Sequence, residues 1–249
     1  MENALPRGRF SPGAWHLGGK EKKGLSEPYP SAWHPSPTCK GGHGASPQPT
    51  VDPIVIAART VVALQTIVAR EKDPQDPAVV TVGSIHGGNK HNIIPAEVKL
   101  QITVRAYKDE VRKHILAAIE RIARAEAEAA GAPKEPAFAV VESCPATYND
   151  PKLTARIAAA LRRTLGDSNV IDVPPQMASE DFSEYGLAGV PAVQWSLGAG
   201  DPAKLKELAA AGQQPPSLHS SLFASDRDPT IATGVEAEVA VLMDLLGKR

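Results

Sequence analysis

The 249-residue sequence has few cysteines, almost no net charge and no long apolar run. Each of these three features excludes a class of protein. The two cysteines, Cys39 and Cys144, cannot form a disulfide framework and lack the C-x-x-C spacing of a metal site. With 27 Lys+Arg against 28 Asp+Glu, the net charge of -1 provides no broad basic field for nucleic acid or anionic lipid. No apolar run approaches the roughly 18 to 20 residues that span a bilayer, and the start, MENALPRGRF, has no signal-peptide pattern. We therefore expect a cytoplasmic protein with neither nucleic acid nor membrane as a partner.

Valine and isoleucine are absent from residues 1–40, which are rich in Gly, Pro, Lys and Ser instead. Such a segment buries too little apolar surface to offset the entropy of ordering its backbone. Two Trp-His pairs, Trp15 with His16 and Trp33 with His34, suit a metal or ligand, but no supporting scaffold is visible. We favour a disordered or atypical N-terminal arm.

From residue 41 the pattern changes to alternating helices and strands. Asp52 is expected to cap a helix that has Pro53 at its first position. This helix is expected to extend to about residue 71. After it, the sequence predicts strands at 78–85 and 93–107, a helix at 108–130 and a strand at 138–141. This order is a split β-α-β motif without its first strand, which would have to lie just before Lys40.

A boundary is expected near residues 146–150, giving domains at 41–146 and 147–249. The elements predicted after it are a helix at 153–165, extended segments at 169–173 and 192–197, and a helix at 230–246. The chain is therefore expected to be an α/β protein in two partial domains.

Three residues of the first domain could carry chemistry. His43 lies in the glycine-rich loop GGHGASP, where an imidazole can donate to an oxyanion or carry a proton, although a loop histidine is more often without function. Asn92 offers an amide donor and acceptor at a strand start, or closes a turn. Arg105 lies on the polar face of a strand. Its guanidinium could bind a carboxylate through two hydrogen bonds, but an exposed strand arginine is usually an ordinary solvated residue.

The second domain offers a histidine and two adjacent carboxylates. His219 in SLHSSLFASD is the best single metal-ligand candidate, because loop imidazoles are common ligands of zinc-like metals. Glu180 and Asp181 in MASEDFSEY are neighbours in sequence but form no catalytic dyad by themselves, and helix capping explains them equally well. A catalytic metal needs at least three protein ligands, and the histidines show no H-x-x-x-H or H-x-D spacing.

Four segments occur in an informative order: GGHGASPQPTVDPIVIAARTVVALQTIVARE, HGGNKHNIIPAEVKLQITVRAY, MASEDFSEY and SLHSSLFASD. Over residues 40–247 the chain resembles the metal-dependent aminoacylase and carboxypeptidase superfamily, in particular its amidohydrolase branch of hippurate hydrolases and plant auxin-conjugate hydrolases. The resemblance implies a ferredoxin-like lid and dimerisation domain at 41–146, with four strands and two helices. It also implies that 147–249 is the C-terminal part of an α/β metallopeptidase-type catalytic domain.

The same resemblance implies roles for single residues. His43 matches the lid histidine that reaches into the partner subunit's active site and stabilises the oxyanion. Asn92 and Arg105 match positions that bind the substrate's carboxylate or its polar neighbours. His219 matches the last metal-ligand histidine, and Glu180 with Asp181 matches a motif near the active site.

The family's early catalytic segment has no counterpart in the sequence. Its Cys-x-His or His-x-Asp ligand pair, its Glu-Glu pair with the general base and a further His are missing. The implied activity is metal-dependent hydrolysis of the amide bond of N-acyl amino acids by a homodimer that holds divalent metal such as zinc or manganese. We expect this chain to be a truncated member with little or no activity that does not hold the metals stably. The alternatives are a non-catalytic interaction module that uses the unpaired edge left by the missing strand, and a small-molecule sensor.

Overall fold

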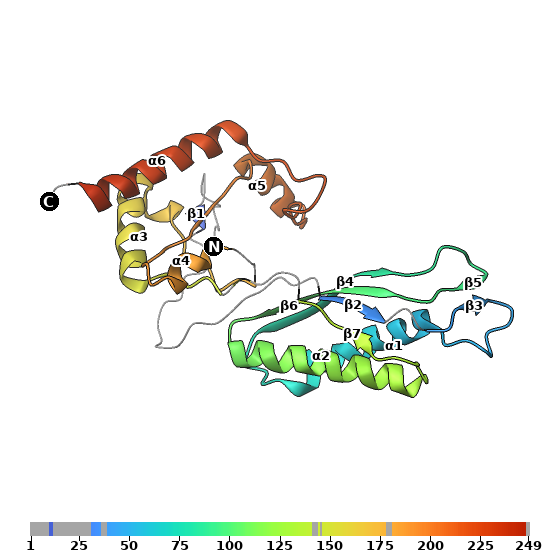
Figure 1. Ribbon diagram of the computed structural model, residues 1–249. Coiled ribbons are helices and arrows are strands. Elements are labelled where there is room, and N and C mark those ends of the chain that lie inside the picture. Colours follow the sequence, from blue (N-terminus) through green and yellow to red (C-terminus); the bar gives the residue numbers. More distant parts are fainter. Residues whose placement is uncertain are drawn as a thin grey trace. The chain divides into compact units, whose positions relative to one another are not determined.

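The computed structural model describes residues 10–11, 31–35, 39–140, 144, 146–177 and 181–247. The chain divides into two compact units. Among the described residues, the sheet unit comprises 31–35, 39–140, 144, 146–147, 177 and 181–188, and the helical unit comprises 10–11, 148–176 and 189–247. Figure 1 follows both units along the chain by colour.

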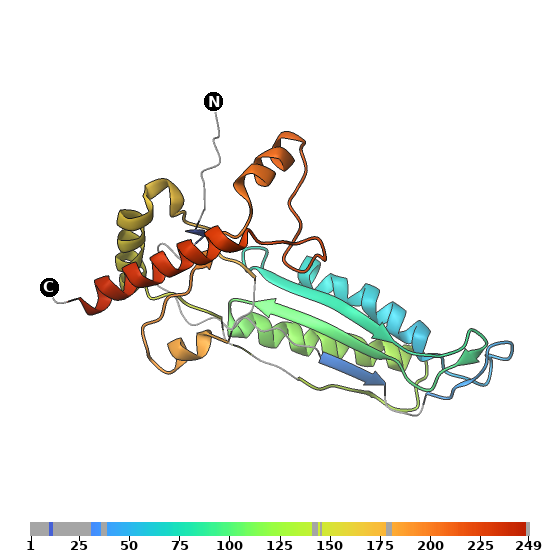
Figure 2. The ribbon, with the colours of Figure 1, turned by 90° about the horizontal axis from the view of Figure 1, so that it is seen from above.

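A four-stranded antiparallel sheet forms the centre of the sheet unit, and two helices cover one of its faces (Figure 2). The strands lie in the order β4 (Ala78–His86), β6 (Lys99–Ala106), β2 (Ser31–Pro35) and β7 (Pro136–Ala137). The helices are α1 (Pro53–Thr66), which continues as the π-helical turn η1 (Ile67–Glu71), and α2 (Asp109–Ala129). Along the chain the order β2, α1, β4, β6, α2, β7 is the ferredoxin-like split β-α-β arrangement that the sequence predicted.

Strand β2 corrects the expectation that residues 31–35 belong to an arm without regular structure. It pairs with β6, where Ser31 lies opposite Ile102, and with β7, where Pro35 lies opposite Pro136. The motif's first strand therefore does lie just before Lys40, and β6 has no unpaired edge on that side. A segment without valine or isoleucine gives no strand signal of its own, and backbone pairing with two neighbouring strands determines its conformation. Trp15 and His16 lie outside the described residues.

The core of the sheet unit lies between β6 and the two helices. Buried and half-buried residues alternate along β6, with Leu100, Ile102 and Val104 on the helix side. Ile115 and Ile119 of α2 belong to the same core, as the helical spacing of the apolar residues predicted. The expected single strand at 93–107 is two strands, β5 (Ile93–Ile94) and β6, because the chain leaves the ladder at Pro95 and re-enters it at Lys99.

Helix α1 starts as predicted but has one property that the sequence reading missed. The Asp52 carboxylate accepts a hydrogen bond from the Ile54 amide at 2.9 Å, and Pro53 occupies the first helical position. By length and composition, Pro53–Glu71 is apolar enough to cross a membrane, contrary to our expectation that no such run exists. Ile56 and Leu64 on its inner side are fully buried in the core. A core helix needs this apolar composition, so composition alone is weak support for a membrane span.

In the helical unit, α3 (Pro151–Leu165) packs against α6 (Arg227–Leu246) around a small apolar core. The buried residues of that core are Ile157, Leu161, Val170, Val193, Ala237 and Val241. The Asn149 side chain donates to the Gln194 carbonyl and accepts from the Gln194 amide, both at 2.8 Å, which joins two distant chain segments. The remaining elements of this unit are β1 (Phe10–Ser11), η2 (Asp167–Asn169), β8 (Ser196–Leu197) and α5 (Pro202–Ala210).

Several short elements differ from the sequence prediction. The expected strand at 138–141 is β7 at Pro136–Ala137, and α5 lies in an alanine-rich segment for which no helix was predicted. The Asp201 side chain caps α5 by accepting from the Ala203 amide at 2.8 Å, a signal that the sequence contained. Helix α4 (Ser183–Leu187) groups with the sheet unit, although its residues were assigned to the second domain.

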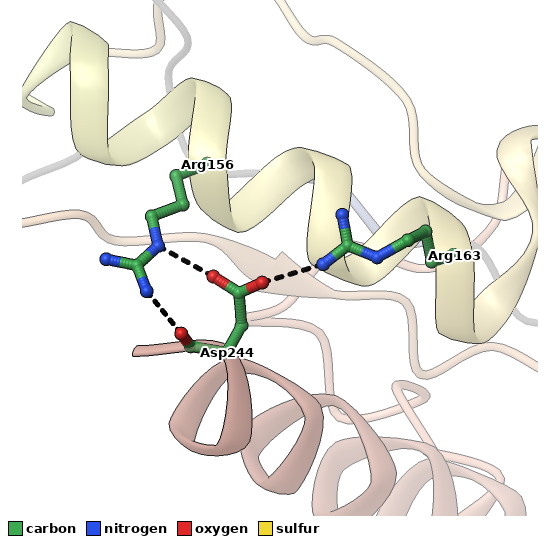
Figure 3. A network of polar contacts seen from close by, with 3 residues as sticks. All are labelled: Arg156, Arg163 and Asp244. Carbon is green, nitrogen blue, oxygen red and sulfur yellow. Dashed lines mark hydrogen bonds and ion pairs between the residues drawn. The ribbon is translucent and has the colours of Figure 1, made fainter. Parts of the chain in front are cut away.

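Three charged side chains join α3 to α6 (Figure 3). The Asp244 carboxylate accepts from Arg156 Nε and from Arg163 Nη2, each at 2.7 Å, and Arg156 also donates to the Asp244 backbone carbonyl. Hydrogen bonding to Arg156 lowers the pKa of the Asp244 carboxyl, and the interaction with Arg163 adds to this. The ionised Asp244 carboxylate, bound by Arg156 and Arg163, therefore stabilises the packing of α3 against α6.

Candidate functional site

His43 and Asn92 are brought together at one end of the sheet unit. Strand β3 (Gly42–His43) pairs antiparallel with β5, placing His43 opposite Ile93, and the Gly44 amide donates to the Asn92 carbonyl at 2.7 Å. Both side chains are exposed. Figure 1 shows β3 and β5 side by side beyond the end of the four-stranded sheet. We call this pair of short strands the tip.

The hydrogen bonding of His43 fixes which ring nitrogen can donate. Its Nδ1 accepts a hydrogen bond from the Ala45 amide at 3.1 Å, so the proton of a neutral ring lies on Nε2. An exposed Nε2–H is a donor that an oxygen of a bound molecule can use. The local geometry is therefore consistent with the oxyanion role that the resemblance implies.

Two glycines allow the strands of the tip to approach closely. A Cβ at Gly41 would lie 2.6 Å from the Ile94 carbonyl oxygen, and a Cβ at Gly44 would lie 3.2 Å from the Asn92 carbonyl carbon. Because both obstacles are backbone atoms, neither can be avoided by a side-chain rotation. The glycine-rich loop is thus explained by the close approach that holds His43 beside Asn92.

Arg105 is not the fully solvated residue that a strand arginine often is. It lies on the face of β6 opposite the helices, where it pairs with Val79 of β4. Its Nη1 atom is buried and has no hydrogen-bond partner among the residues that the structure describes, and burial lowers the pKa of the guanidinium. A buried cationic donor without a partner is costly, and a bound carboxylate would satisfy it.

Within one chain, Arg105 stands far from the tip. It lies six residues beyond Lys99 on β6, which corresponds to about 20 Å along an extended strand. The tip belongs to the loop before Lys99, so the distance from His43 is greater still. The structure therefore joins His43 with Asn92 but does not bring Arg105 to them.

Tyr107 follows Arg105 on the same side of the chain, and sequence reasoning did not single it out. Burial raises the pKa of its phenol. The alternation that places residues 103 and 105 on one face also includes residue 107, so this pattern could have identified it.

The predicted metal site is not assembled in the described part of the chain. His219 lies exposed in a turn of the helical unit, and Asp181 is exposed just before α4 in the sheet unit. Glu180 lies outside the described residues. Among the residues that the structure describes, no three His, Cys, Asp or Glu side chains gather to hold a metal. These residues alone do not fit a metal centre, and the ligand role of His219 stays a prediction.

In the helical unit, a cavity of about 770 Å³ lies between α3, α5 and α6. Its charged lining residues are Asp201, Lys206, Asp226 and Glu236. None of the candidate residues from the sequence analysis is among the described residues that line it. The cavity therefore adds no support to the predicted chemistry.

The family match covers part of the sheet unit. Residues 38–131 match the family model M20_dimer, the peptidase dimerisation domain. These residues thus belong to the M20 peptidase dimerisation family. They contain β3 to β6, α1 and α2, and with them His43, Asn92 and Arg105.

The curated relatives extend the similarity into the helical unit. The chain is 34% identical over 189 residues to thermostable carboxypeptidase 2 of Saccharolobus solfataricus, covering 76% of this chain and 45% of that one. It is 35% identical to the hippurate hydrolase of Campylobacter jejuni (59% and 38% covered) and 36% identical to the IAA-amino acid hydrolase ILR1-like 2 of Arabidopsis thaliana (59% and 34% covered). These relatives confirm the predicted superfamily and its amidohydrolase branch. The chain spans less than half the length of each of them.

Solved structures share the fold of nearly the whole chain. The Bacillus subtilis YXEP protein, described as a dinuclear metal-binding peptidase from the M20 family, superposes with a TM-score of 0.56 at 20% identity. The match covers 92% of this chain and 52% of that one. Both units therefore have counterparts in an M20 fold, and about half of that neighbour has no counterpart here.

Proposed function

We propose that this chain provides the dimerising and substrate-binding part of a metal-dependent amidohydrolase that cleaves the amide bond of N-acyl amino acids. The observation that carries the proposal is Nη1 of Arg105, which lies buried on the side of β6 opposite the helices and has no hydrogen-bond partner among the described residues. The free carboxylate of an N-acyl amino acid is the anion that a planar guanidinium binds through two parallel hydrogen bonds. The amidohydrolase names of the relatives support this substrate class.

The distance between Arg105 and the tip favours a site shared by two subunits. About 20 Å exceeds the length of a small N-acyl amino acid, so one substrate cannot contact Arg105 and His43 of the same chain. In a homodimer, the tip of one subunit can reach a substrate held by the other. His43 would then donate from Nε2 to the oxyanion, with Asn92 beside it.

Strand β4 is the edge best suited to pair two sheet units. The other edge strand, β7, has two residues and begins with Pro136, which has no amide hydrogen to donate. Strand β4 has nine residues without Lys, Arg, Asp, Glu or Pro, so no charge or proline opposes edge pairing, and its only irregularity against β6 is a register shift between Val82 and Ser84. Helix α1 contacts β4 and exposes Val55 and Val62, seven residues apart on one helix face. We therefore propose an isologous dimer through β4 and α1.

The isolated chain is expected to hydrolyse N-acyl amino acids little or not at all. Its described residues do not gather three metal-binding side chains. Turnover of N-acetyl or N-benzoyl amino acids in the presence of zinc or manganese measures this directly. Hydrolysis that a chelator abolishes would contradict the expectation.

Ligand binding tests the proposed role of Arg105 independently of turnover. Hippurate, which is N-benzoylglycine, should shift backbone amide resonances of β6 in NMR spectra, and its carboxamide analogue should not. Arg105→Met should abolish the shifts, whereas Lys99→Met, at the other end of the same strand face, should preserve them. Equal shifts with the carboxamide, or with Arg105→Met, would show that the guanidinium does not bind the carboxylate.

A further inference from the structure

Ile93 is an apolar residue of the tip whose place in the sequence is not explained by core packing. It is 53% exposed on β5 and does not belong to the described hydrophobic core of the sheet unit. Single exposed apolar residues are ordinary on a protein surface, so exposure alone assigns Ile93 no role. Its position in the strand pairing is informative, because Ile93 lies directly opposite His43.

Hydrogen bonding across the tip shows which kind of pair His43 and Ile93 form. The Gly44 amide donates to the Asn92 carbonyl at 2.7 Å, so that neighbouring pair is hydrogen-bonded. Hydrogen-bonded and non-hydrogen-bonded pairs alternate along an antiparallel ladder, and His43 with Ile93 is therefore a non-hydrogen-bonded pair. The Ile93 amide agrees with this, because it donates to the Lys90 carbonyl of its own turn at 3.2 Å.

The side chains of a non-hydrogen-bonded pair lie close together. They project from the same face of the ladder, with Cβ atoms about 5 Å apart. The tip therefore presents the His43 imidazole and the Ile93 side chain next to each other, and both are exposed. One offers a hydrogen-bond donor and the other a purely apolar surface. A bound group that contacts both must combine an oxygen acceptor with a hydrocarbon substituent beside it.

The amide of an N-acyl amino acid has this combination. An oxygen that accepts from His43 Nε2 lies about 3 Å from it, so the substituents of the carbonyl carbon come within reach of the residue beside His43. One substituent is the amino acid, whose carboxylate binds Arg105 in the proposed function. The other is the acyl group, which is the substituent left to contact Ile93.

We propose that Ile93 is a specificity-determining residue that selects substrates with larger apolar acyl groups over N-acetyl substrates. This inference rests on the proposed function, because it uses a substrate held by Arg105 of one subunit and contacted by the tip of the other. Ile93 has no catalytic step in it. Its side chain acts only by removing apolar surface of the bound acyl group from water.

Binding of glycine conjugates by the full 249-residue chain tests this assignment, because glycine leaves the acyl group as the only variable apolar part. Calorimetry should show that N-hexanoylglycine binds at least about tenfold more tightly than N-acetylglycine. Ile93→Thr should reduce this ratio to less than about threefold, whereas Ile93→Val should retain most of it. Threonine and valine are both β-branched and suit a strand, so the two variants differ only in a hydroxyl against a methyl group.

The control is Ile231→Thr, which makes the same change at an isoleucine of the helical unit that is 60% exposed. It should leave the affinity ratio unchanged. Hydrogen exchange of the Gly44 amide reports whether the tip stays closed, and it should be the same in Ile93→Thr and Ile93→Val. Faster exchange in Ile93→Thr alone would attribute the loss of the ratio to an open tip and would overturn the assignment.

The role of Ile93 and the proposed function can fail separately. Equal affinity for both conjugates, or a ratio that Ile93→Thr leaves unchanged, would overturn the role of Ile93 while Arg105 still binds the carboxylate. A ratio that Ile231→Thr lowers equally would overturn this role as well. Absence of any carboxylate-dependent binding of the two conjugates would overturn both proposals.

Discussion

Substitution of Gly41 by alanine should separate the two strands of the tip. The new Cβ would lie 2.6 Å from the Ile94 carbonyl oxygen and 3.1 Å from the Pro95 carbonyl carbon. Both contacts are shorter than van der Waals separation, and both partners are backbone atoms. The strain can be relieved only if the chain before β3 moves away from β5, and this movement displaces His43 from Asn92.

The expected size of the effect follows from the cost of overpacking. Inserting one methyl group into a space that cannot expand costs about 1 to 3 kcal/mol. If this cost falls on the closed tip, the equilibrium constant for local opening of the tip should be about 5 to 150 times larger in Gly41→Ala than in the wild type. The three atoms nearest to the new Cβ all belong to Ile94 and Pro95, so the strain falls on the tip and the global unfolding free energy should change little.

Hydrogen exchange of the Gly44 amide measures this opening, because that amide donates to the Asn92 carbonyl across the tip at 2.7 Å. Its exchange should accelerate in Gly41→Ala, while the amides of β6 keep their protection. Gly186→Ala is the matched control, since a Cβ there meets no atom within 4 Å. Unchanged exchange of Gly44 in Gly41→Ala would refute the close-approach argument, and equal acceleration in the control would show a non-local effect.

Three further substitutions test other parts of the structure. Leu161→Ala removes a fully buried side chain of the helical unit and should lower its unfolding free energy by about 2 to 5 kcal/mol, with hydrogen exchange of β6 in the sheet unit unaffected. Val62→Lys should weaken the proposed dimer at least about tenfold in sedimentation equilibrium. Val140→Lys, which follows the opposite edge strand β7, should leave the dimer intact. Equal dissociation in both variants would show that the dimer does not form through β4 and α1. Asp244→Asn should lower the melting temperature at neutral pH, because Arg156 holds the pKa of this carboxyl below its ordinary value. Since a depressed pKa stabilises the fold only while the group is ionised, the difference from wild type should begin to shrink as the pH falls below about 4, near the unfolded-state pKa, and should be lost once the pH passes below the depressed pKa of the folded state. A difference that does not shrink on acidification would contradict the ion-pair explanation.

Much of the sheet unit could be predicted from local patterns. The alternation in Leu100, Ile102 and Val104 gave β6 and its buried face, and Asp52 followed by Pro53 gave the start of α1. The sequence indicated that the motif's first strand would have to lie just before Lys40, but it did not identify residues 31–35 as that strand, because they carry no β-branched side chain and depend on pairing with β6 and β7. The candidate residues were identified by type and by resemblance, and their mutual distances were not available from sequence.

The sequence alone determined which residues form helices and strands wherever the apolar period is regular, and it pointed to the amidohydrolase relationship through four ordered motifs. These are local properties, set by side-chain spacing along a single segment. Only the tertiary structure decided that His43 meets Asn92 while Arg105 stands at the far end of the strand, because β-pairing joins segments about fifty residues apart. It alone also decided that one apolar side of α6 is buried while the other lies exposed, since helical periodicity does not specify which side a neighbouring helix covers.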